Sequence, residues 1–425
     1  MDKKKGLVVL VMGFLFLTFI CTERVFASSL ERDVIKIGVA SALKRPFGIG
    51  SVRGAEMAAN EINSAGGVLG AKVKLFLVDT EATAPKATEG IERLVYTDKV
   101  DGIVGAYSSE EATAFQEQSA KLKINILYQG TTRLLDEKYK ANPDKYKYSW
   151  IYAISDLQVS EYVKDHQLDL LVNGIKKLTG INKVNVAVLT DVSLATEVVH
   201  DDFQKAIKAR SDCNLVYSGK ISRDAVDFTA EISQLRTKNT QLIIAWAGYT
   251  AGYTFIKQAY DLRLPAIMSG VVSLSWSVGD FIKAVGLEAA AHTSSLCMFS
   301  METTPKTIQL LKDYDRIYGG APHMTAGNTY NGVKAYVKAV EIAGSLNHDK
   351  VQKALEKVRL PENQTWNCKE FSFTDSHRLR VSQKDGLIVY TFQLGPDGKA
   401  NIIDPPEFRK GSLSLPKHMI DHWKK

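Results

Sequence analysis

Apolar and polar positions alternate in long blocks from residue 34 onward. The first block, VIKIGVAS (34–41), has the near-continuous apolar character of a buried strand, and RGAEMAANEINSAGG (53–67) follows it with helical spacing and a glycine stop. Further strands are predicted at KVKLFLVDT (72–80), VDGIVGAY (100–107) and INILYQG (124–130), and further helices at APKATEGIERLVYTD (84–98) and EEATAFQEQSAKLK (110–123). This run of strand–helix units predicts a parallel sheet with helices on both faces.

The alternation pauses at DEKYKANPDKYKYSW (136–150), which has no clear period and is predicted to be a loop. It then restarts. Helices are predicted around 158–178 and 196–210 and at 227–238, 252–262, 304–319, 328–344 and 348–358, with strands at 184–190, 215–221, 241–247 and 265–270 and a strand-rich tail from about 366. The fold class is therefore α/β, with two Rossmann-like lobes, each built on a parallel central sheet. The default ligand site is the cleft between them, because parallel sheets bind ligands beyond the carboxyl ends of their strands.

The first 27 residues have the pattern of a secretory signal peptide. A basic DKKK precedes the apolar run GLVVLVMGFLFLTFI, and Val25 and Ala27 suit a cleavage site before Ser28. An uncleaved anchor and a lipoprotein modified at Cys21 remain alternatives, although Ile20 is larger than the residue a lipoprotein signal places there. We expect a mature chain exported to the periplasm.

Composition narrows the function classes. The 425 residues carry a formal net charge of +7 without a dense Lys/Arg cluster interleaved with aromatics, so nucleic acid is not an expected partner. After cleavage, Cys213, Cys297 and Cys368 allow at most one internal disulfide, and buried thiols are expected for at least two of them.

No catalytic, metal or cofactor motif stands out in the sequence. The segment GIGSVRG has glycines at 48, 50 and 54, and this spacing is one residue longer than that of the Gly-x-Gly-x-x-Gly dinucleotide fingerprint. In that fingerprint the first glycine directly follows the strand, whereas here about six residues lie between them. His418 and His422 share a helical spacing, but no third metal ligand lies nearby, and the end of the chain is predicted to be a solvated tail. We therefore expect no cofactor, no bound metal and no enzyme activity.

The stretch from IKIGVAS through RGAEMAANEINSAGG to GAYSS, together with DFTAEISQLR and YNGVKAYVKAVEIAG, resembles the periplasmic solute-binding proteins of the branched-chain amino acid and amide group. The resemblance covers nearly the whole mature chain. It implies the type I periplasmic (Venus-flytrap) fold, with two lobes joined by a multi-crossover hinge of three crossings that closes on a small solute. It places lobe 1 at 28–153 plus about 291–365 and lobe 2 at 154–290 plus about 366–425. It also implies delivery to the membrane permease of an ABC transporter, and we expect a monomer.

The same resemblance suggests solute-binding residues. Hydroxyls at a helix start hold a ligand carboxylate in this family, and Ser108, Ser109, Thr131 and Thr132 match those positions, next to Gly130. Simple helix capping is the alternative role for these hydroxyls. An apolar wall is expected from Phe47 and Ile49, in the loop before the first helix, although packing against the neighbouring lobe would explain them equally well.

The second lobe departs from the family pattern. Relatives that bind amino acids often have an aromatic-glycine pair where this chain has Leu194-Ala195, beside Ser193. They also often have an acidic residue for the ammonium group of the amino acid, where this chain has Ala251. The remaining candidates to meet the ammonium group are Asp156, Asp191, Glu110 and Glu111. Arg133 could pair with a carboxylate, although a surface role is the favoured alternative.

Aromatic side chains at strand ends would suit a flat or apolar solute, although each of them could equally belong to the core. They are Tyr107, Tyr152, Trp246, Tyr249 and Trp276. The expected solute is an amino acid, an amide or a small or aromatic carboxylate. The alternatives to a transport receptor are a ligand-sensing partner of a signalling receptor and, more remotely, an exported enzyme.

Overall fold

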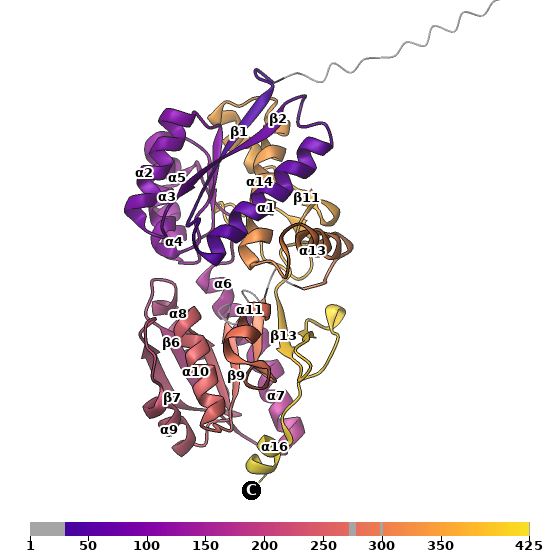
Figure 1. Ribbon diagram of the computed structural model, residues 1–425. Coiled ribbons are helices and arrows are strands. Elements are labelled where there is room, and N and C mark those ends of the chain that lie inside the picture. Colours follow the sequence, from indigo (N-terminus) through magenta and orange to yellow (C-terminus); the bar gives the residue numbers. More distant parts are fainter. Residues whose placement is uncertain (1–29, 272–277, 298–300, 425) are drawn as a thin grey trace, which may run out of the picture.

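The computed structural model describes residues 30–271, 278–297 and 301–424, which form two stacked α/β lobes (Figure 1). The predicted signal peptide lies outside the described residues. No helix among those described is both long and apolar enough to span a bilayer.

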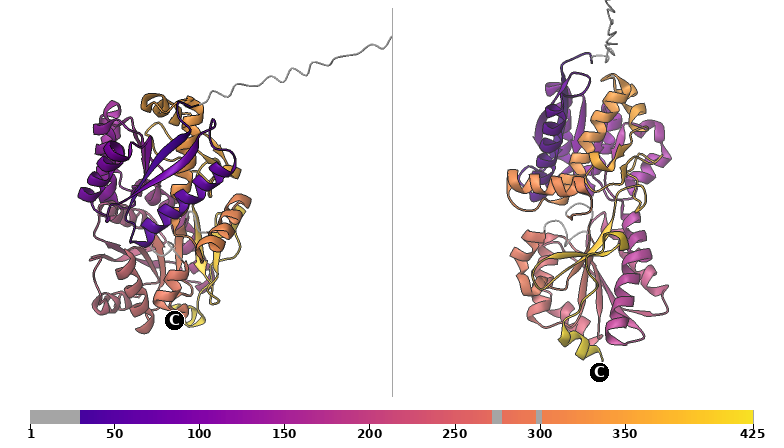
Figure 2. Two further views of the ribbon diagram at one scale, coloured as in Figure 1. Left: turned by 45° about the horizontal axis from the view of Figure 1, so that its top comes forward. Right: turned by 90° about the vertical axis from the view of Figure 1, so that its right-hand side faces the viewer.

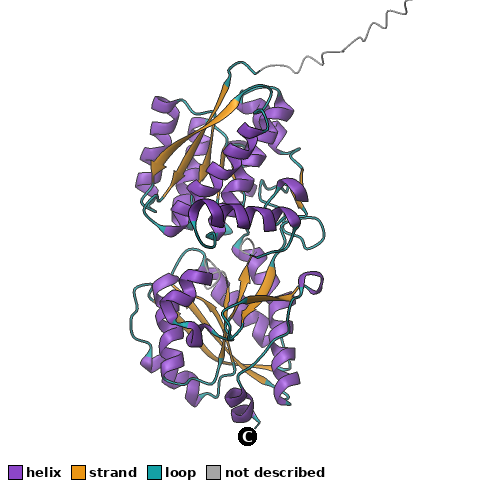
Figure 3. Cartoon of the chain, turned by 45° about the vertical axis from the view of Figure 1, so that its right-hand side comes forward, coloured by secondary structure: helices purple, strands orange, loops and turns teal. Residues whose placement is uncertain are grey.

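Lobe 1 is built on a five-stranded sheet in the order β2-β1-β3-β4-β5, in which every neighbouring pair is parallel. Its strands are β1 (Val34–Ser41), β2 (Lys72–Asp79), β3 (Gly102–Gly105), β4 (Ile126–Tyr128) and β5 (Ser149–Ile151). Its helices are α1 (Pro46–Ser64), α2 (Ala84–Arg93) with a π-helical end at Leu94–Asp98, α3 (Ser109–Leu122), α4 (Leu134–Ala141), α5 (Pro143–Tyr146), α13 (Pro305–Tyr318), α14 (Met324–Ala343) and α15 (His348–Leu355). Helices flank the sheet in both lobes (Figure 3).

Lobe 2 is built on a seven-stranded sheet in the order β14-β13-β10-β9-β8-β6-β7. Its strands are β6 (Val184–Asp191), β7 (Cys213–Ile221), β8 (Leu242–Trp246), β9 (Ile267–Val271), β10 (Ser294–Cys297), β13 (Tyr390–Leu394) and β14 (Ala400–Asp404). The strands from β7 to β10 are parallel, as predicted, whereas β13 and β14 add an antiparallel edge. Its helices are α6 (Asp156–Tyr162), a π-helical turn (Val163–Gln167), α7 (Leu168–Thr179), α8 (Thr196–Lys208), α9 (Thr229–Thr237), α10 (Tyr249–Asp261), α11 (Val278–Val285), α12 (Leu287–Ala290) and α16 (Lys417–Trp423).

Late segments of the chain return to lobe 1, as Figure 2 shows for the orange helices beside the indigo ones. α14 packs along α1, and this crossing is very close: a Cβ added to Gly54 would lie 2.0 Å from the carbonyl oxygen of Ala326. Glycine is required at that point because any side chain would force the helices apart.

The segments that change lobes differ from the expected boundaries. β10, expected in lobe 1, pairs with β9 and β13, so the chain leaves lobe 2 only between Cys297 and Pro305. The chain around Trp366 stays on lobe 1, where the Asn331 side-chain amide both donates to the Trp366 carbonyl (2.9 Å) and accepts from its N–H (2.7 Å). The short pair β11 (Leu360–Pro361) and β12 (Glu370–Phe371), with a 3₁₀ turn at Glu362–Gln364, forms in this segment, and the return to lobe 2 occurs close to Tyr390.

Two segments predicted to be irregular are helical. The stretch 136–150 contains α5 and most of α4, because the Asn142 side chain caps α5 and Glu117 of α3 binds Lys138 and Lys145. The end of the chain forms α16, which leaves His418 and His422 exposed to solvent, as predicted. It is helical because Trp423 is buried and its indole N–H donates to the Pro265 carbonyl at 3.0 Å. The Asn142 cap and Pro143 are a local signal for α5, whereas the contacts of Glu117 and Trp423 are tertiary and have no local sequence signal.

Cys213, Cys297 and Cys368 are all buried thiols, as expected for at least two of them. Burial raises the pKa of the Cys368 thiol far above its usual range, because the thiolate would lose its hydration.

Candidate functional site

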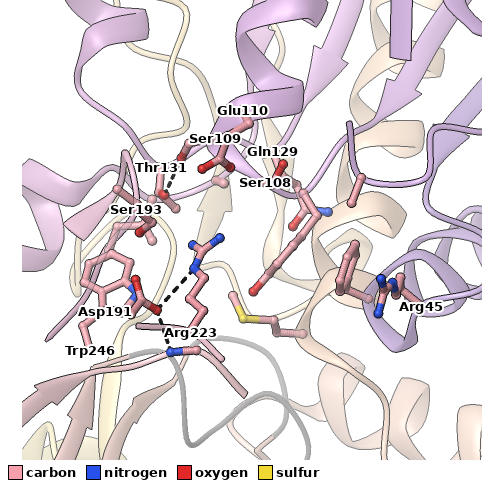
Figure 4. A pocket seen from close by; sticks show the side chains of 18 of the residues that line it. Arg45, Ser108, Ser109, Glu110, Gln129, Thr131, Asp191, Ser193, Arg223 and Trp246 are labelled. Atoms are coloured by element: carbon pink, nitrogen blue, oxygen red, sulfur yellow. Dashed lines mark hydrogen bonds and ion pairs between the residues drawn. The ribbon is translucent and has the colours of Figure 1, made fainter. Parts of the chain in front are cut away.

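A cleft of about 570 Å³ lies between the facing ends of the two lobes. It is lined by Arg45, Phe47, Ala82, Tyr107, Ser108, Ser109, Glu110, Gln129, Thr131, Ala153, Ile154, Asp191, Ser193, Ala195, Arg223, Asp224, Trp246, Gly248, Thr250, Met324 and Asn328. Most of these residues follow the carboxyl ends of parallel strands, where this type of sheet places its ligands. Figure 4 shows both walls from close by.

The hydroxyl loop of lobe 1 lies at the start of α3. The Ser108 hydroxyl accepts the Glu111 N–H at 3.2 Å, and the Glu111 carboxylate accepts the N–H groups of Ser108 (3.1 Å) and Tyr107 (3.3 Å). This reciprocal capping box fixes the backbone of the loop. Ser109 and Thr131 present hydroxyls 3.2 Å apart, and both line the cleft.

Glu111 belongs to the support of this loop and not to the cleft surface. It is fully buried and also accepts a hydrogen bond from Thr80. Burial raises its pKa, and the hydrogen bonds that it accepts oppose the rise. The carboxylate of Glu111 therefore takes up the N–H groups of Tyr107 and Ser108, which are then not available to a solute.

An aromatic wall stands beside the hydroxyl loop. The rings of Phe47 and Tyr107 stack with centroids 4.5 Å apart at 24°, and His323 packs edge-on against Tyr107 at 5.9 Å. Burial lowers the pKa of His323 to about 3, so this imidazole is neutral at ordinary pH.

Phe47 lies within α1, and not in a flexible loop as predicted. α1 begins at Pro46, a residue suited to a first helical turn, and the Thr325 hydroxyl donates to the Phe47 carbonyl at 2.7 Å. The glycines allow close packing at this point, since a Cβ added to Gly48 would lie 1.8 Å from the Ala42 carbonyl oxygen. The propensity of glycine for loops is overridden here by tertiary packing.

The lobe 2 wall is built around Asp191, the last residue of β6. Its carboxylate is only 2% exposed, and it accepts hydrogen bonds from the Gly248 N–H at 2.6 Å and the Thr196 hydroxyl at 3.2 Å. Arg223, just after β7, places its Nε 3.6 Å from the same carboxylate. Trp246, at the end of β8, completes this side of the cleft.

Several residues suggested by the sequence lie together in the cleft. Those that line it are Phe47, Tyr107, Ser108, Ser109, Thr131, Ser193, Trp246, Asp191 and Glu110. Contact with a solute remains a prediction for each of them.

Other suggested residues do not line the cleft. Ile49 is 37% exposed, Gly130 packs against lobe 1 side chains, and Thr132 is buried. The buried Tyr152 uses its hydroxyl on the Gly105 backbone, where it donates to the carbonyl and accepts from the N–H, each at 3.1 Å. Tyr249 begins α10, with its side chain outside the description, and Trp276 lies outside the described residues.

The charged candidates near the hinge pair with one another and not with the cleft. Arg133 of lobe 1 contacts the buried Asp156 (Nε to Oδ1, 3.3 Å) and reaches Asp202 of α8 in lobe 2 (Nη2 to Oδ2, 2.6 Å). Burial raises the pKa of Asp156, and Arg133 and the Leu157 N–H counteract this. Arg133 is thus a link between the lobes.

Two groups of polar or flexible lining residues were not predicted from the sequence. Gln129, Arg223 and Asp224 directly follow β4 and β7, so the strand-end rule alone would have found them. Met324 and Asn328 come from the start of α14, and only the folded chain reveals their position. The Asn328 side-chain N–H donates to Gln129 at 2.6 Å.

No group of three or more potential metal ligands occurs within residues 30–271, 278–297 and 301–424. The cleft instead offers hydroxyls, aromatic rings and charged side chains. Such a set can hold a small solute by hydrogen bonds, apolar contact and ion pairing.

The fold and the two-sided cleft are those of a bilobal solute-binding protein. Residues 34–382 match the family described as "Periplasmic binding protein", and the chain belongs to this family. The Leu/Ile/Val-binding protein homolog 7 of Brucella abortus (strain 2308) is 24% identical over 390 residues, which cover 86% of this chain and 92% of that protein.

Solved structures show the same fold. A branched-chain amino acid transporter substrate-binding protein from Streptococcus pneumoniae, in complex with isoleucine, superposes with a TM-score of 0.71 at 20% identity, covering 88% of this chain and all of that one (100%). An ABC transporter solute-binding protein from R. palustris, in complex with benzoate, gives a TM-score of 0.68 at 16% identity, covering 90% of this chain and 98% of that one. The predicted fold class and family are therefore confirmed.

Proposed function

We propose that this protein is the extracytoplasmic solute-binding receptor of an ABC-type importer, capturing a small solute between its lobes and delivering it to a membrane permease. The observation that carries the proposal is the cleft itself, which takes polar and aromatic side chains from both lobes. A solute that contacts both walls stabilises the closed arrangement, because ligands shift a conformational equilibrium by their differential affinity.

The lining supports an amino acid, an amide or a small or aromatic carboxylate as the solute. Ser109, Thr131 and Ser193 supply hydroxyls, Phe47 and Tyr107 supply an aromatic wall, and the cleft volume suits a molecule of this size. We propose that these residues, with Ser108, contact the solute. The isoleucine and benzoate bound by the relatives above fall within this range of ligands.

The proposed role is binding without turnover, in the periplasm, by a monomer that acts with a permease. Family membership supports this role, and the apolar run before Ser28 supports export. The proposed removal of residues 1–27 would leave a mature chain that begins at Ser28.

The test is a binding screen on the purified chain from Ser28. Branched-chain amino acids, their amides, and aliphatic and aromatic acids are added singly, and thermal shifts are followed by calorimetric titration. The proposal expects at least one solute to bind at one molecule per chain, because a ligand bound only by the native state raises the melting temperature. Native mass spectrometry of the freshly purified protein identifies any solute that co-purifies. No binding in either experiment, or turnover of a bound solute, would contradict the proposal.

A further inference from the structure

One cationic side chain in the described cleft lining, Arg223, is held by a neighbouring carboxylate and still has N–H donors without a partner. Asp191 provides the support, since Gly248 and Thr196 hydrogen-bond its carboxylate and keep it nearly inaccessible to solvent. Because both carboxylate oxygens already have partners, Asp191 serves to hold Arg223 and has little capacity left for a solute ammonium group.

Arg223 uses only one edge of its guanidinium on this support. Its Nε faces Asp191 at 3.6 Å, and across the described ranges Nη1 and Nη2 have neither a hydrogen bond nor an ion pair. Figure 4 shows the guanidinium pointing from the lobe 2 wall toward Thr131 and Ser109 of lobe 1. The side chain is about half exposed (49%), which leaves these donors open to a ligand. The remaining edge of this planar guanidinium, formed by Nη1 and Nη2, matches the geometry of a carboxylate.

The glycine at the start of α10 is part of this arrangement. A Cβ added to Gly248 would lie 3.1 Å from Oδ2 of Asp191 and 3.6 Å from Cγ of Arg223. The missing side chain therefore lets the carboxylate reach the backbone N–H while the arginine stem passes beside it.

Lobe 1 disfavours an anion at the place where the sequence analysis expected one. The carboxylate of Glu111 already accepts the Tyr107 and Ser108 N–H groups, and Glu110 lines the cleft beside them. A solute carboxylate at this loop would face two negative charges, and like charges in a partly buried site repel strongly. The remaining charges of the lining are Arg45 at the exposed start of α1 and Asp224 next to Arg223.

We propose that Arg223, positioned by Asp191, is the anion-binding residue of the cleft and takes the carboxylate of a small organic acid whose apolar body packs on the Phe47–Tyr107 wall and Trp246. The inference rests on the proposed function and deepens it: the solute's carboxylate is bound by lobe 2 and not by the hydroxyl loop of lobe 1.

Matched pairs of probes test the proposal. Each pair differs only in its carboxylate: benzoate and benzamide, 4-methylpentanoate and 4-methylpentanamide, leucine and leucinamide. Dissociation constants are measured by calorimetry for the wild type, Arg223→Gln, Arg223→Lys and the control Arg316→Gln, which removes the same charge from the exposed surface of α13. In the wild type, the acid of at least one pair should bind about tenfold or more tightly than its amide, as expected for a charge-assisted bidentate contact.

Arg223→Gln should weaken acid binding by about tenfold or more and leave amide binding within about twofold, so that the preference disappears. Arg223→Lys should be intermediate, because lysine keeps the charge and loses the planar fork. Arg316→Gln should match the wild type. Equal losses for acid and amide in Arg223→Gln would overturn the proposal, since Arg223 would then only shape the cleft.

Asp191→Asn tests the positioning role. It keeps the size of the side chain and removes the charge that holds Arg223. The ratio of acid to amide affinity should fall while amide affinity stays unchanged. General damage to the cleft would instead lower both affinities together and would contradict the positioning role.

The outcomes separate the two proposals. If the wild-type protein binds each amide with the same affinity as its matched acid, the receptor function stands and the proposed role of Arg223 is overturned. If none of the six probes binds and native mass spectrometry finds no solute, both proposals fall.

Discussion

The two walls of the cleft are built from equivalent strand-to-helix turns, yet they carry different chemistry. In lobe 1 the Glu111 carboxylate accepts the backbone N–H groups of the turn after β3. The side chains that this lobe places in the cleft are mainly hydroxyls and aromatic rings. In lobe 2 the turn after β6 holds a carboxylate, Asp191, that supports a cation from the neighbouring strand end. We call the lobe 1 side, with its hydroxyls and rings, the shape-reading wall, and the lobe 2 side, with Asp191 and Arg223, the charge-reading wall. We propose that a bound solute needs both.

The largest predicted effect concerns the stability of lobe 1 in acid. His377 stacks on Trp150 with centroids 3.6 Å apart, and burial lowers its pKa to about 4, against an ordinary value of 6.5. The unfolded chain therefore binds a proton in this range that the folded chain does not. This stabilising contribution is present above pH 6.5 and is lost as the pH falls toward 4, at about 1.4 kcal/mol per pH unit.

His377→Phe keeps a ring against Trp150 and removes the titration. The free energy of unfolding of the wild type should fall by up to about 3 kcal/mol relative to this variant between pH 6.5 and 4. Denaturant unfolding of both proteins across this range is the measurement, and titration of other groups cancels in the difference. A constant difference between the two proteins would contradict the neutral buried imidazole.

The second prediction tests the shape-reading wall. Phe47→Ala should weaken solute binding by about tenfold or more, because it removes a large apolar contact and its stacking on Tyr107. The fold should persist, since Thr325 holds the backbone carbonyl of Phe47 and not its ring. Ile49→Ala is the matched control, expected to change affinity by less than about twofold, because Ile49 lies outside the cleft lining. Unchanged affinity in Phe47→Ala would remove this wall from the site.

The third prediction tests the charge-reading wall without changing any charge. Gly248→Ala places a methyl group 3.1 Å from Asp191 Oδ2, which must shift by a few tenths of an ångström. Acid probes should bind about three- to tenfold more weakly and amide probes about as before, because only the orientation of Arg223 is disturbed. Calorimetry on one acid and amide pair is sufficient. An equal loss for both probes would mean that the turn shapes the whole cleft.

The smallest predicted effect concerns the link between the walls. Asp202→Asn removes the negative charge from the 2.6 Å ion pair with Arg133 and should lower the free energy of unfolding by about 0.5–1 kcal/mol, as is usual for a partly exposed ion pair. Asp201→Asn, at the adjacent exposed position, should have no effect. Thermal unfolding of the three proteins makes the comparison, and identical curves would show that the two lobes are not coupled through Arg133.

The sequence was sufficient for the elements with strong periodicity. Strands such as 34–41 and 184–190 form as predicted, and they belong to the parallel sheet of lobe 1 and the parallel part of the lobe 2 sheet. The strands and their order follow from local hydrophobic pattern and chain topology, which a single sequence contains. Ser109 and Thr131, which line the cleft, were suggested instead by the resemblance to the solute-binding family.

The failures share a different cause. Pro46 starts α1 despite the glycines behind it, and α16 forms because Trp423 reaches Pro265, far away in the sequence. Arg133 was a candidate for a solute carboxylate or for the surface, and the structure instead places Asp156 and Asp202 beside it. In each case a contact between distant segments overrides the local pattern, and a single sequence does not reveal such contacts.

The most direct test of the account is a crystal structure of the protein with its preferred acid probe from the matched pairs. We predict one molecule in the cleft, with its carboxylate on the Nη atoms of Arg223 and its body between Phe47 and Trp246. A carboxylate bound at Ser109 and Thr131 instead, or a probe that contacts one lobe alone, would contradict the division of the cleft into a shape-reading and a charge-reading wall.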